Sequence, residues 1–181
     1  MNKKVLGIYI HIPFCKSKCY YCDFKSFSNI ENKEEEYINC LIKEIKNKNW
    51  DEINKKYEIT TVYIGGGTPS FVDCKQIEKI VKEIKESAKL KNAEITIEIN
   101  PGTVNEEKLV TYKNVGINRL SIGLQSMNNN LLKQIGRIHT YEQFLETYKL
   151  ALKVGFNNIN VDLMLGLPNQ TIEDLKNSIE E

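Results

Sequence analysis

The chain has 181 residues, which is enough for one domain with a hydrophobic core. It is 41% hydrophobic and 27% charged, with a formal net charge of +1, so its composition argues against intrinsic disorder and against a nucleic-acid-binding surface. No apolar run reaches about 18 residues, the length of a membrane span. Residues 1–15 resemble the start of a signal peptide, but the apolar run is short and no small-residue cleavage site follows. We therefore expect a cytoplasmic protein.

Short β-like runs alternate with longer amphipathic segments along the chain. Strands are predicted over Val5–Ile12, Thr61–Ile64, Glu94–Ile99, Arg119–Leu124 and Asn158–Leu165. Helices are predicted over Asn32–Lys48, Asp73–Lys89, Asn105–Val115, Thr140–Val154 and from Thr171 onward. This alternation predicts an α/β fold with a parallel sheet or barrel.

Capping signals support several of these helices. Three patterns resemble capping boxes, namely Asn32 with Glu35, Asp73 with Gln76, and Thr140 with Gln143. Gly116 and Gly155 stand where helix-ending glycines belong. The segments around these glycines, 115–124 and 154–163, form a weak internal repeat at an offset of 39 residues, which suits a repeated βα unit.

Within the predicted strands, apolar and polar residues alternate. The apolar faces of four strands are formed in turn by Ile8, Ile10 and Ile12; by Ile95, Ile97 and Ile99; by Leu120, Ile122 and Leu124; and by Ile159, Val161, Leu163 and Leu165. The opposite faces carry Tyr9 and His11, Thr96, Glu98 and Asn100, Ser121, Gly123 and Gln125, and Asn160, Asp162 and Met164. Successive side chains point to opposite faces of a strand, so the polar set shares one face. We interpret that face as a ligand cavity, with a water-exposed sheet surface as the alternative.

Cys15, Cys19 and Cys22 form a C-x3-C-x2-C cluster directly after the first predicted strand. Three clustered thiolates suit Zn²⁺ or an iron–sulfur cluster. Three cysteines on a [4Fe–4S] cluster leave one iron open for an outside ligand, whereas a structural Zn site would need His11 or Asp23 as its fourth ligand. The other two of the five cysteines, Cys40 and Cys74, are interpreted as ordinary thiols.

The cysteine segment resembles the C-x3-C-x-φ-C signature of the radical S-adenosylmethionine (SAM) superfamily, with Tyr21 as the aromatic residue. Further motifs resemble the branch that contains oxygen-independent coproporphyrinogen III oxidase and a radical-SAM haem chaperone. They are Tyr9–Cys15 (YIHIPFC), Gly65–Pro69 (GGGTP), Glu98–Pro101 (EINP) and Ser121–Ser126 (SIGLQS). The resemblance covers nearly the whole chain. It implies an α/β fold that is a partial parallel (β/α) barrel, with about five of the family's six βα units.

The resemblance also implies cofactors and their ligands. In this family the three cysteines hold a [4Fe–4S] cluster, and SAM ligates the open iron and is cleaved to a 5′-deoxyadenosyl radical. The implied SAM contacts are Tyr9, Gly66, Gly67, Thr68, Glu98, Gln125, Arg137 and Asp162. Taken singly, each is also compatible with a structural role, for example a tight turn or a hydrogen bond.

The remaining basic and imidazole side chains have simpler interpretations. Arg119 and Arg137 are the only two arginines, and arginine in a lysine-rich chain points to a geometric task such as clamping a carboxylate. For Arg119 we favour a structural ion pair. His11 either lies near the cluster or makes a structural hydrogen bond, and His139 is interpreted as a loop residue.

Two features favour the haem chaperone within this branch. The oxidase pattern has a fourth cysteine two residues after the third, where this chain has Phe24, and the oxidase carries a longer segment before the cluster. We therefore expect a protein that binds haem and transfers it to an acceptor protein. We also expect an electron donor among its partners. The alternatives are the oxidase, an oxidoreductase of the coproporphyrinogen dehydrogenase type acting on a porphyrinogen, and a structural Zn module.

The C-terminal helix has no end signal, and a crossover helix normally leads back to another parallel strand. We therefore expect residues 1–181 to be a radical-SAM core domain that lacks its sixth βα unit and a C-terminal domain. In that case, the haem-binding region would belong to the longer protein.

Overall fold

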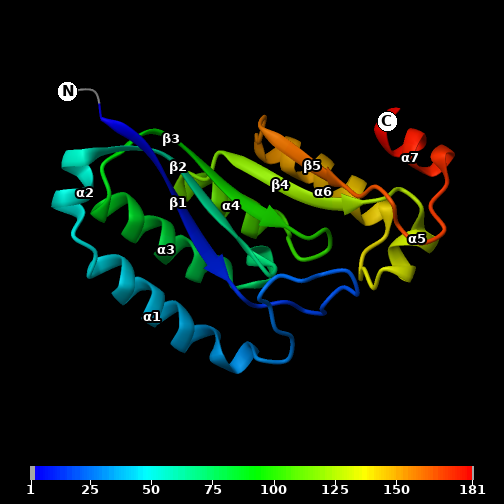
Figure 1. Cartoon of the computed structure of the whole chain (residues 1–181), viewed down its shortest axis with the longest axis horizontal. Helices are drawn as coiled ribbons and strands as arrows, with labels where there is room; N and C mark the ends of the chain where they lie inside the picture. The colour runs from blue at the N-terminus through cyan, green and yellow to red at the C-terminus, as the bar shows by residue number, and fades with distance from the viewer. Residues whose placement is uncertain (1–2, 181) are drawn as a thin grey trace.

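Five parallel strands form the sheet of the computed structural model, which describes residues 3–180. The strands neighbour one another in chain order, β1-β2-β3-β4-β5, and every pair is parallel. Their bounds are Lys4–Ile12 (β1), Tyr57–Gly66 (β2), Leu90–Ile99 (β3), Arg119–Gln125 (β4) and Ile159–Leu163 (β5). The five predicted strands are confirmed, and their arrows point the same way in Figure 1.

The long helices cover one face of this sheet and lie below and behind it in Figure 1. The long helices are α1 (Glu34–Lys46), α3 (Cys74–Ser87), α4 (Glu106–Val115) and α6 (Tyr141–Val154). The shorter elements are α2 (Trp50–Lys56), α5 (Asn129–Gln134), α7 (Ile172–Glu180) and the 3₁₀ turns η1 (Glu31–Lys33) and η2 (Pro69–Phe71). Helix α1 packs on α3, α3 on α4, and α4 on α6. The predicted α/β fold is confirmed.

The core lies between the helices and the apolar face of the sheet. Ile97 and Ile122 of the strands are fully buried against Ile80 and Leu109 of the helices. The prediction that Leu165 extends the apolar face of the fifth strand is wrong, because the Leu165 side chain is 78% exposed. Gln125, the last residue of β4, pairs with Leu163, and its carbonyl also accepts a hydrogen bond from the Met164 N–H at 2.9 Å, so the described pairing with β4 ends before Leu165.

Most of the predicted caps are present. Thr140 forms the predicted capping box with Gln143. Asp73 caps α3 as expected, but its side chain accepts from the Lys75 N–H, so the predicted box with Gln76 is not formed. Gly116 and Gly155 end α4 and α6 with φ of +103° and +97°. The prediction that Asn32 caps a helix is wrong. Residues 31–33 form the 3₁₀ turn η1, and α1 begins at Glu34 without a side-chain cap.

Two short helices, α2 and α5, were not predicted from the sequence. Each is capped by an asparagine side chain, Asn49 or Asn128. Segments this short do not complete enough turns to show an apolar period.

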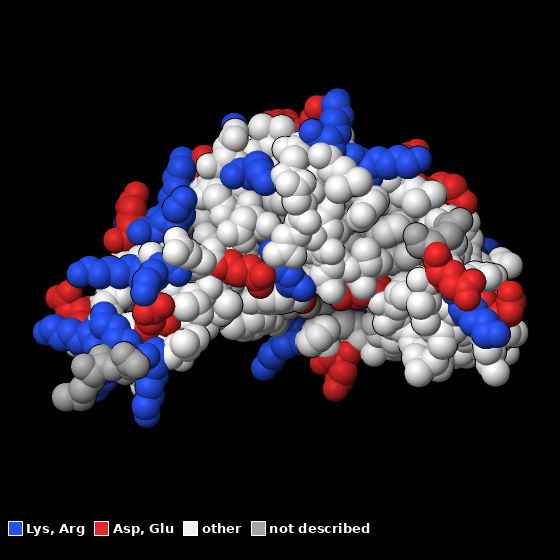
Figure 2. Space-filling view, turned by 90° about the horizontal axis from the view of Figure 1, so that it is seen from above, with Lys and Arg blue, Asp and Glu red and all other residues white. Residues whose placement is uncertain are grey.

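Within the described residues, no helix is long and apolar enough to cross a membrane. On the face seen in Figure 2, basic and acidic side chains lie mainly around the periphery, and both signs occur there, while much of the centre carries neither.

Candidate functional site

The polar residues of β3, β4 and β5 lie in rows across the sheet. Glu98 is beside Ser121, and Ser121 is beside Asn160. Two residues further along these strands, on the same face of the sheet, Gly123 is beside Asp162. Parallel pairing thus gathers on one face the side chains that strand alternation grouped together.

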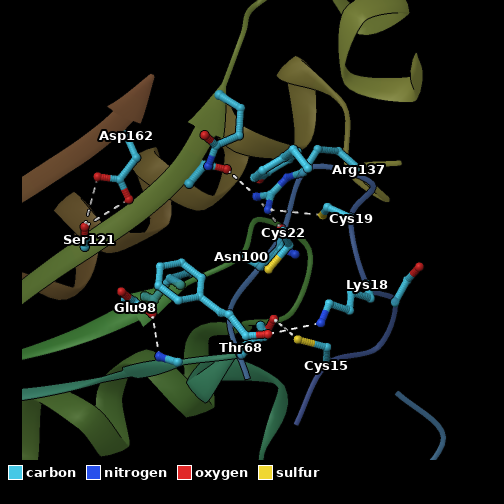
Figure 3. A pocket seen from close by; sticks show the side chains of 18 of the residues that line it. Cys15, Lys18, Cys19, Cys22, Thr68, Glu98, Asn100, Ser121, Arg137 and Asp162 are labelled. Atoms are coloured by element: carbon cyan, nitrogen blue, oxygen red, sulfur yellow. Dashed lines mark hydrogen bonds between the residues drawn. The ribbon is translucent and has the colours of Figure 1, made fainter. Parts of the chain in front are cut away.

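A cavity of about 390 Å³ lies between this face and the loop that follows β1 (Figure 3). Its lining residues are Cys15, Ser17, Lys18, Cys19, Tyr21, Cys22, Phe24, Tyr63, Gly66, Gly67, Thr68, Glu98, Ile99, Asn100, Ser121, Gly123, Gln125, Arg137, Asp162 and Met164. Ten of the eleven predicted site residues are among them, and Tyr9 is the exception. The structure therefore has a cavity where strand alternation predicted one.

The three thiols of the cysteine loop border this cavity. Cys15 is buried and accepts a hydrogen bond from Thr68 Oγ1 at 3.5 Å. Cys19 and Cys22 are half-buried and belong to one turn, in which the Cys22 N–H donates to the Cys19 carbonyl at 3.1 Å. Among the described residues, no three His, Cys, Asp or Glu side chains are grouped so that they could hold a single metal ion.

The glycine-rich turn after β2 packs directly against the cysteine loop. The Thr68 N–H donates to the Phe14 carbonyl at 2.8 Å. A Cβ on Gly67 would lie 2.8 Å from that carbonyl oxygen and 2.9 Å from Cys15 Sγ, so only glycine fits. Gly66 has φ of +120°, in the left-handed region. The turn is therefore a tight βα connection that also brings backbone to the cavity.

Glu98 presents a carboxylate to the cavity from the end of β3. Tyr63 Oη donates to Oε1 at 2.8 Å, and the Gly66 N–H donates to Oε2 at 3.0 Å. Burial raises the pKa of Glu98 despite these two donors, and burial together with the Glu98 charge raises the pKa of Tyr63. Each carboxylate oxygen can accept a further hydrogen bond, so Glu98 can also bind an ammonium or hydroxyl group.

Asp162 presents a second carboxylate from β5. Ser121 Oγ lies 3.3 and 3.2 Å from its two oxygens, and Asn160 Nδ2 donates to Oδ1 at 2.6 Å. Asn160 Nδ2 also donates to Ser121 Oγ at 3.1 Å. These neutral donors orient the carboxylate and leave its charge uncompensated (Figure 3).

Arg137 reaches the cavity from the segment after α5. It donates to the Gly123 carbonyl at 2.5 Å, to Asn100 Oδ1 at 2.9 Å and to Cys19 Sγ at 3.9 Å. Its partners within the described residues are therefore an amide, a carbonyl and a thiol, and it also interacts with the Tyr21 hydroxyl. Gln125, beside it, has φ of +72° at an irregularity in the β4–β5 pairing.

Several observations fit a cluster with SAM beside it. The Arg137 Nε atom is buried and has no hydrogen-bond partner in the described residues, so it fits an acceptor such as a carboxylate. Glu98 and Asp162 supply acceptors for ammonium and hydroxyl groups. The three thiols are soft ligands suited to iron. The close approach of Gly67 to Cys15 leaves the cavity open beside the thiols.

Tyr9 and His11 lie next to the cavity and do not line it. The Tyr9 ring stacks on Tyr63 at 6.3 Å between ring centroids, and Tyr9 Oη lies 3.0 Å from His11 Nδ1. His11 Nε2 lies 2.8 Å from the Lys25 carbonyl oxygen. Both ring nitrogens of His11 are therefore engaged within the protein, which supports its structural interpretation.

The other singled-out residues are not among those that line the cavity. Arg119 pairs with Glu94 at 4.0 Å, as predicted for a structural ion pair. His139 lies in a loop but is buried, and burial together with the Arg137 charge lowers its pKa to about 4. Cys40 is exposed and Cys74 is buried, and both are free.

Sequence reasoning did not select several lining residues as site residues. Asn100, Ser121 and Met164 were on the predicted polar faces, so alternation contained the signal. Tyr63 belongs to the same face of β2, and its contact with Glu98 depends on the β2–β3 register. Lys18 lies on an irregular loop, where no periodicity could have identified it.

Comparisons with known proteins agree with this architecture. A family model described as the Radical SAM superfamily matches residues 9–181. The chain is 40% identical to the heme chaperone HemW of Lactococcus lactis, an alignment that covers 100% of this chain and 46% of that protein. It is 36% identical to the oxygen-independent coproporphyrinogen-III oxidase-like protein HemZ of Bacillus subtilis, over 99% of this chain and 37% of that protein. The chain spans less than half the length of these relatives.

The fold also matches a solved structure, coproporphyrinogen III oxidase (HemN) from Escherichia coli, described as a radical SAM enzyme. The TM-score is 0.88 at 29% sequence identity, and the match covers 98% of this chain and 41% of that one. Methylornithine synthase (PylB) has a TM-score of 0.63 at 15% identity and shares the fold alone. The predicted partial (β/α) barrel of the radical-SAM type is thus confirmed.

Proposed function

Because the chain belongs to the radical SAM superfamily, we propose that Cys15, Cys19 and Cys22 hold a [4Fe–4S] cluster and that the adjoining cavity binds SAM. The observation that carries this proposal is the single cavity shared by the three thiols, the glycine-rich turn and the two carboxylates. When bound, the cluster supplies the electron that cleaves SAM.

In this proposal the protein's own groups bind and orient the cofactor by charge and hydrogen bonding. Glu98 and Asp162 accept hydrogen bonds from the amino and hydroxyl groups of SAM, and Arg137 donates to its carboxylate. Gly66–Thr68 bring backbone close to the ligand, and Tyr9 supports this side of the cavity through its stacking on Tyr63.

For the whole protein we propose a haem chaperone that binds haem and passes it to an acceptor protein. The names of the HemW relatives support this role, as does Phe24, which occupies the position of the oxidase's fourth cysteine. Reduction of the cluster requires an electron donor. A cytoplasmic location suits five free thiols. We also propose that a sixth βα unit and a further domain belong to the protein, in keeping with the length of its relatives.

An oxygen-independent coproporphyrinogen III oxidase is the second candidate. The structural match to HemN and the name of HemZ favour it. In this case the cavity would serve oxidative decarboxylation of a porphyrinogen.

Metal analysis of anaerobically purified protein tests the cluster. We expect iron and sulfide in the unaltered protein and their loss in Cys15→Ala, Cys19→Ala and Cys22→Ala. Cys40→Ala is the matched control, because this thiol is exposed, belongs to α1 and is not among the residues that line the cavity. Zinc without sulfide would instead support the structural Zn module.

Haem titration of the full-length protein tests the chaperone. We expect stoichiometric binding, followed by transfer to an apo-acceptor. Decarboxylated porphyrinogen together with 5′-deoxyadenosine, and no haem binding, would replace the chaperone with the oxidase.

A further inference from the structure

Arg137 touches the cysteine loop as well as the cavity. Its Nη1 lies 3.9 Å from Cys19 Sγ, while Nη2 donates to Asn100 Oδ1 and the Gly123 carbonyl (Figure 3). We propose that Arg137 sets the reduction potential of the cluster through Cys19, and that Asn100 is the positioning residue that holds Arg137 there. This inference rests on the cluster proposed above, and it concerns a role separate from SAM binding.

Asn100 is held firmly enough to act as a positioning residue. Its backbone N–H donates to Ser70 Oγ at 3.1 Å, and its carbonyl accepts from Thr103 Oγ1 at 2.6 Å. The two hydroxyl oxygens are themselves 2.6 Å apart. Pro101, which follows, restricts the backbone of Asn100 further. The side-chain oxygen of Asn100 is therefore presented to Arg137 from a fixed backbone.

The surroundings require the planar fork of arginine. One terminal nitrogen contacts Cys19 while the other contacts two acceptors, which the single ammonium of lysine cannot reproduce in the same geometry. A Cβ on Gly123 would lie 3.0 Å from Arg137 Nη2, so glycine at this position leaves room for the guanidinium. Arg119, the other arginine, instead pairs with Glu94.

The chemical consequence follows from charge. Adding an electron makes an iron–sulfur cluster more negative, and positive charge or hydrogen bonds at its sulfur ligands stabilise that reduced form. Arg137 supplies both at Cys19. Its contact therefore raises the reduction potential and makes the cluster easier to reduce.

A redox titration without SAM tests this role. The full-length protein is reconstituted anaerobically with iron and sulfide, and the reduced cluster is followed by electron paramagnetic resonance. Arg137→Gln is expected to lower the ratio of reduced to oxidised cluster at least tenfold at a given potential, which is a shift of 59 mV for one electron. Arg137→Lys and Asn100→Leu should give smaller shifts in the same direction. Arg119→Gln is the control and should leave the potential unchanged.

A double variant separates positioning from general structural damage. If Asn100 acts through Arg137, Asn100→Leu should add no shift when Arg137→Gln is already present. Cluster content and the thermal unfolding midpoint are compared across the set, and Arg137→Lys carries the test if Arg137→Gln fails to fold. An intact cluster with an unshifted potential, or additive shifts, overturns this inference alone. If the unaltered protein holds no cluster, the proposed function fails and this inference fails with it.

Discussion

The two copies of the internal repeat, 115–124 and 154–163, fold alike but lie in different environments. Each runs from a helix end through a left-handed glycine into a parallel strand. Strand β4 of the first copy lies between β3 and β5, and its interior residues are buried. Strand β5 of the second copy pairs only with β4 among the described strands, and all its residues are half-buried. The repeated pattern therefore sets the backbone, whereas the number of neighbouring strands sets the burial.

The two copies also divide the chemistry of the cavity between them. Equivalent residues of the repeat are direct neighbours across the sheet, as with Gly123 and Asp162. In the first copy glycine leaves room for Arg137, and in the second copy aspartate supplies a carboxylate. Divergence at one repeat position thus leaves space for a guanidinium in one copy and supplies a carboxylate in the other, and both Arg137 and Asp162 line the same cavity.

The largest expected effect is on core packing. Leu120→Ala removes a fully buried side chain and should lower the free energy of unfolding by about 2–5 kcal/mol. Ile159→Ala, at the equivalent position of β5, should cost less than half as much, because that residue is already half-exposed. Equilibrium unfolding in urea measures both. Equal losses would show that β5 is as well packed as β4.

The next effect is on cofactor binding. Asp162→Asn should weaken SAM binding about 10- to 100-fold, because hydrogen bonds to a charged group are worth about 1.5–3 kcal/mol. Equilibrium dialysis of SAM against cluster-loaded protein measures the change. Asn158→Ala is the control, since Asn158 bonds to Glu94 outside the cavity lining. Unchanged affinity in the Asp162 variant would remove Asp162 from the proposed site.

The glycine caps give a smaller and matched comparison. Gly116→Ala and Gly155→Ala should each destabilise by about 1–2 kcal/mol, because both positions require a left-handed backbone. The Gly116 variant should be the worse of the two. Its Cβ would lie 2.8 Å from Lys85 Nζ, which donates to the Val115 carbonyl, whereas no atom lies within 4 Å at Gly155. Thermal unfolding measures the pair, and the reverse order would contradict this account.

The smallest effect concerns Glu98, which lies in the same row as Ser121 of the first copy. Its pKa is raised in the folded state, so the unaltered protein should lose stability as the pH rises above about 4.3, the value for an unfolded chain. Glu98→Gln should remove this loss. The unfolding free energy of the variant minus that of the unaltered protein should therefore increase from pH 4 to 7. Glu142→Gln should show the opposite sign, because hydrogen bonds, chiefly from Thr140, lower the pKa of Glu142. A gap that does not vary with pH would contradict the raised pKa.

Local patterns predicted the fold well, and failed where a segment lacked a period or a partner. The strands and long helices followed from alternation and caps, which involve residues only a few positions apart. Helix α5 was missed because it is too short to show a period. Leu165 was misplaced because strand length depends on how far the neighbouring strand extends, and β4 ends at Gln125.

The sequence by itself determined the spacing of the three thiols, the polar faces of the strands and the two glycine caps, since each is a local property. Only the tertiary structure decided which groups meet. Arg137 reaches Cys19 across 118 residues of chain, and Gly67 meets Cys15 only because β1 and β2 pair in one register. Such contacts depend on strand order and loop packing, which no local pattern encodes. For the same reason Asn100 could be recognised as the residue that positions Arg137 only once the chain was folded.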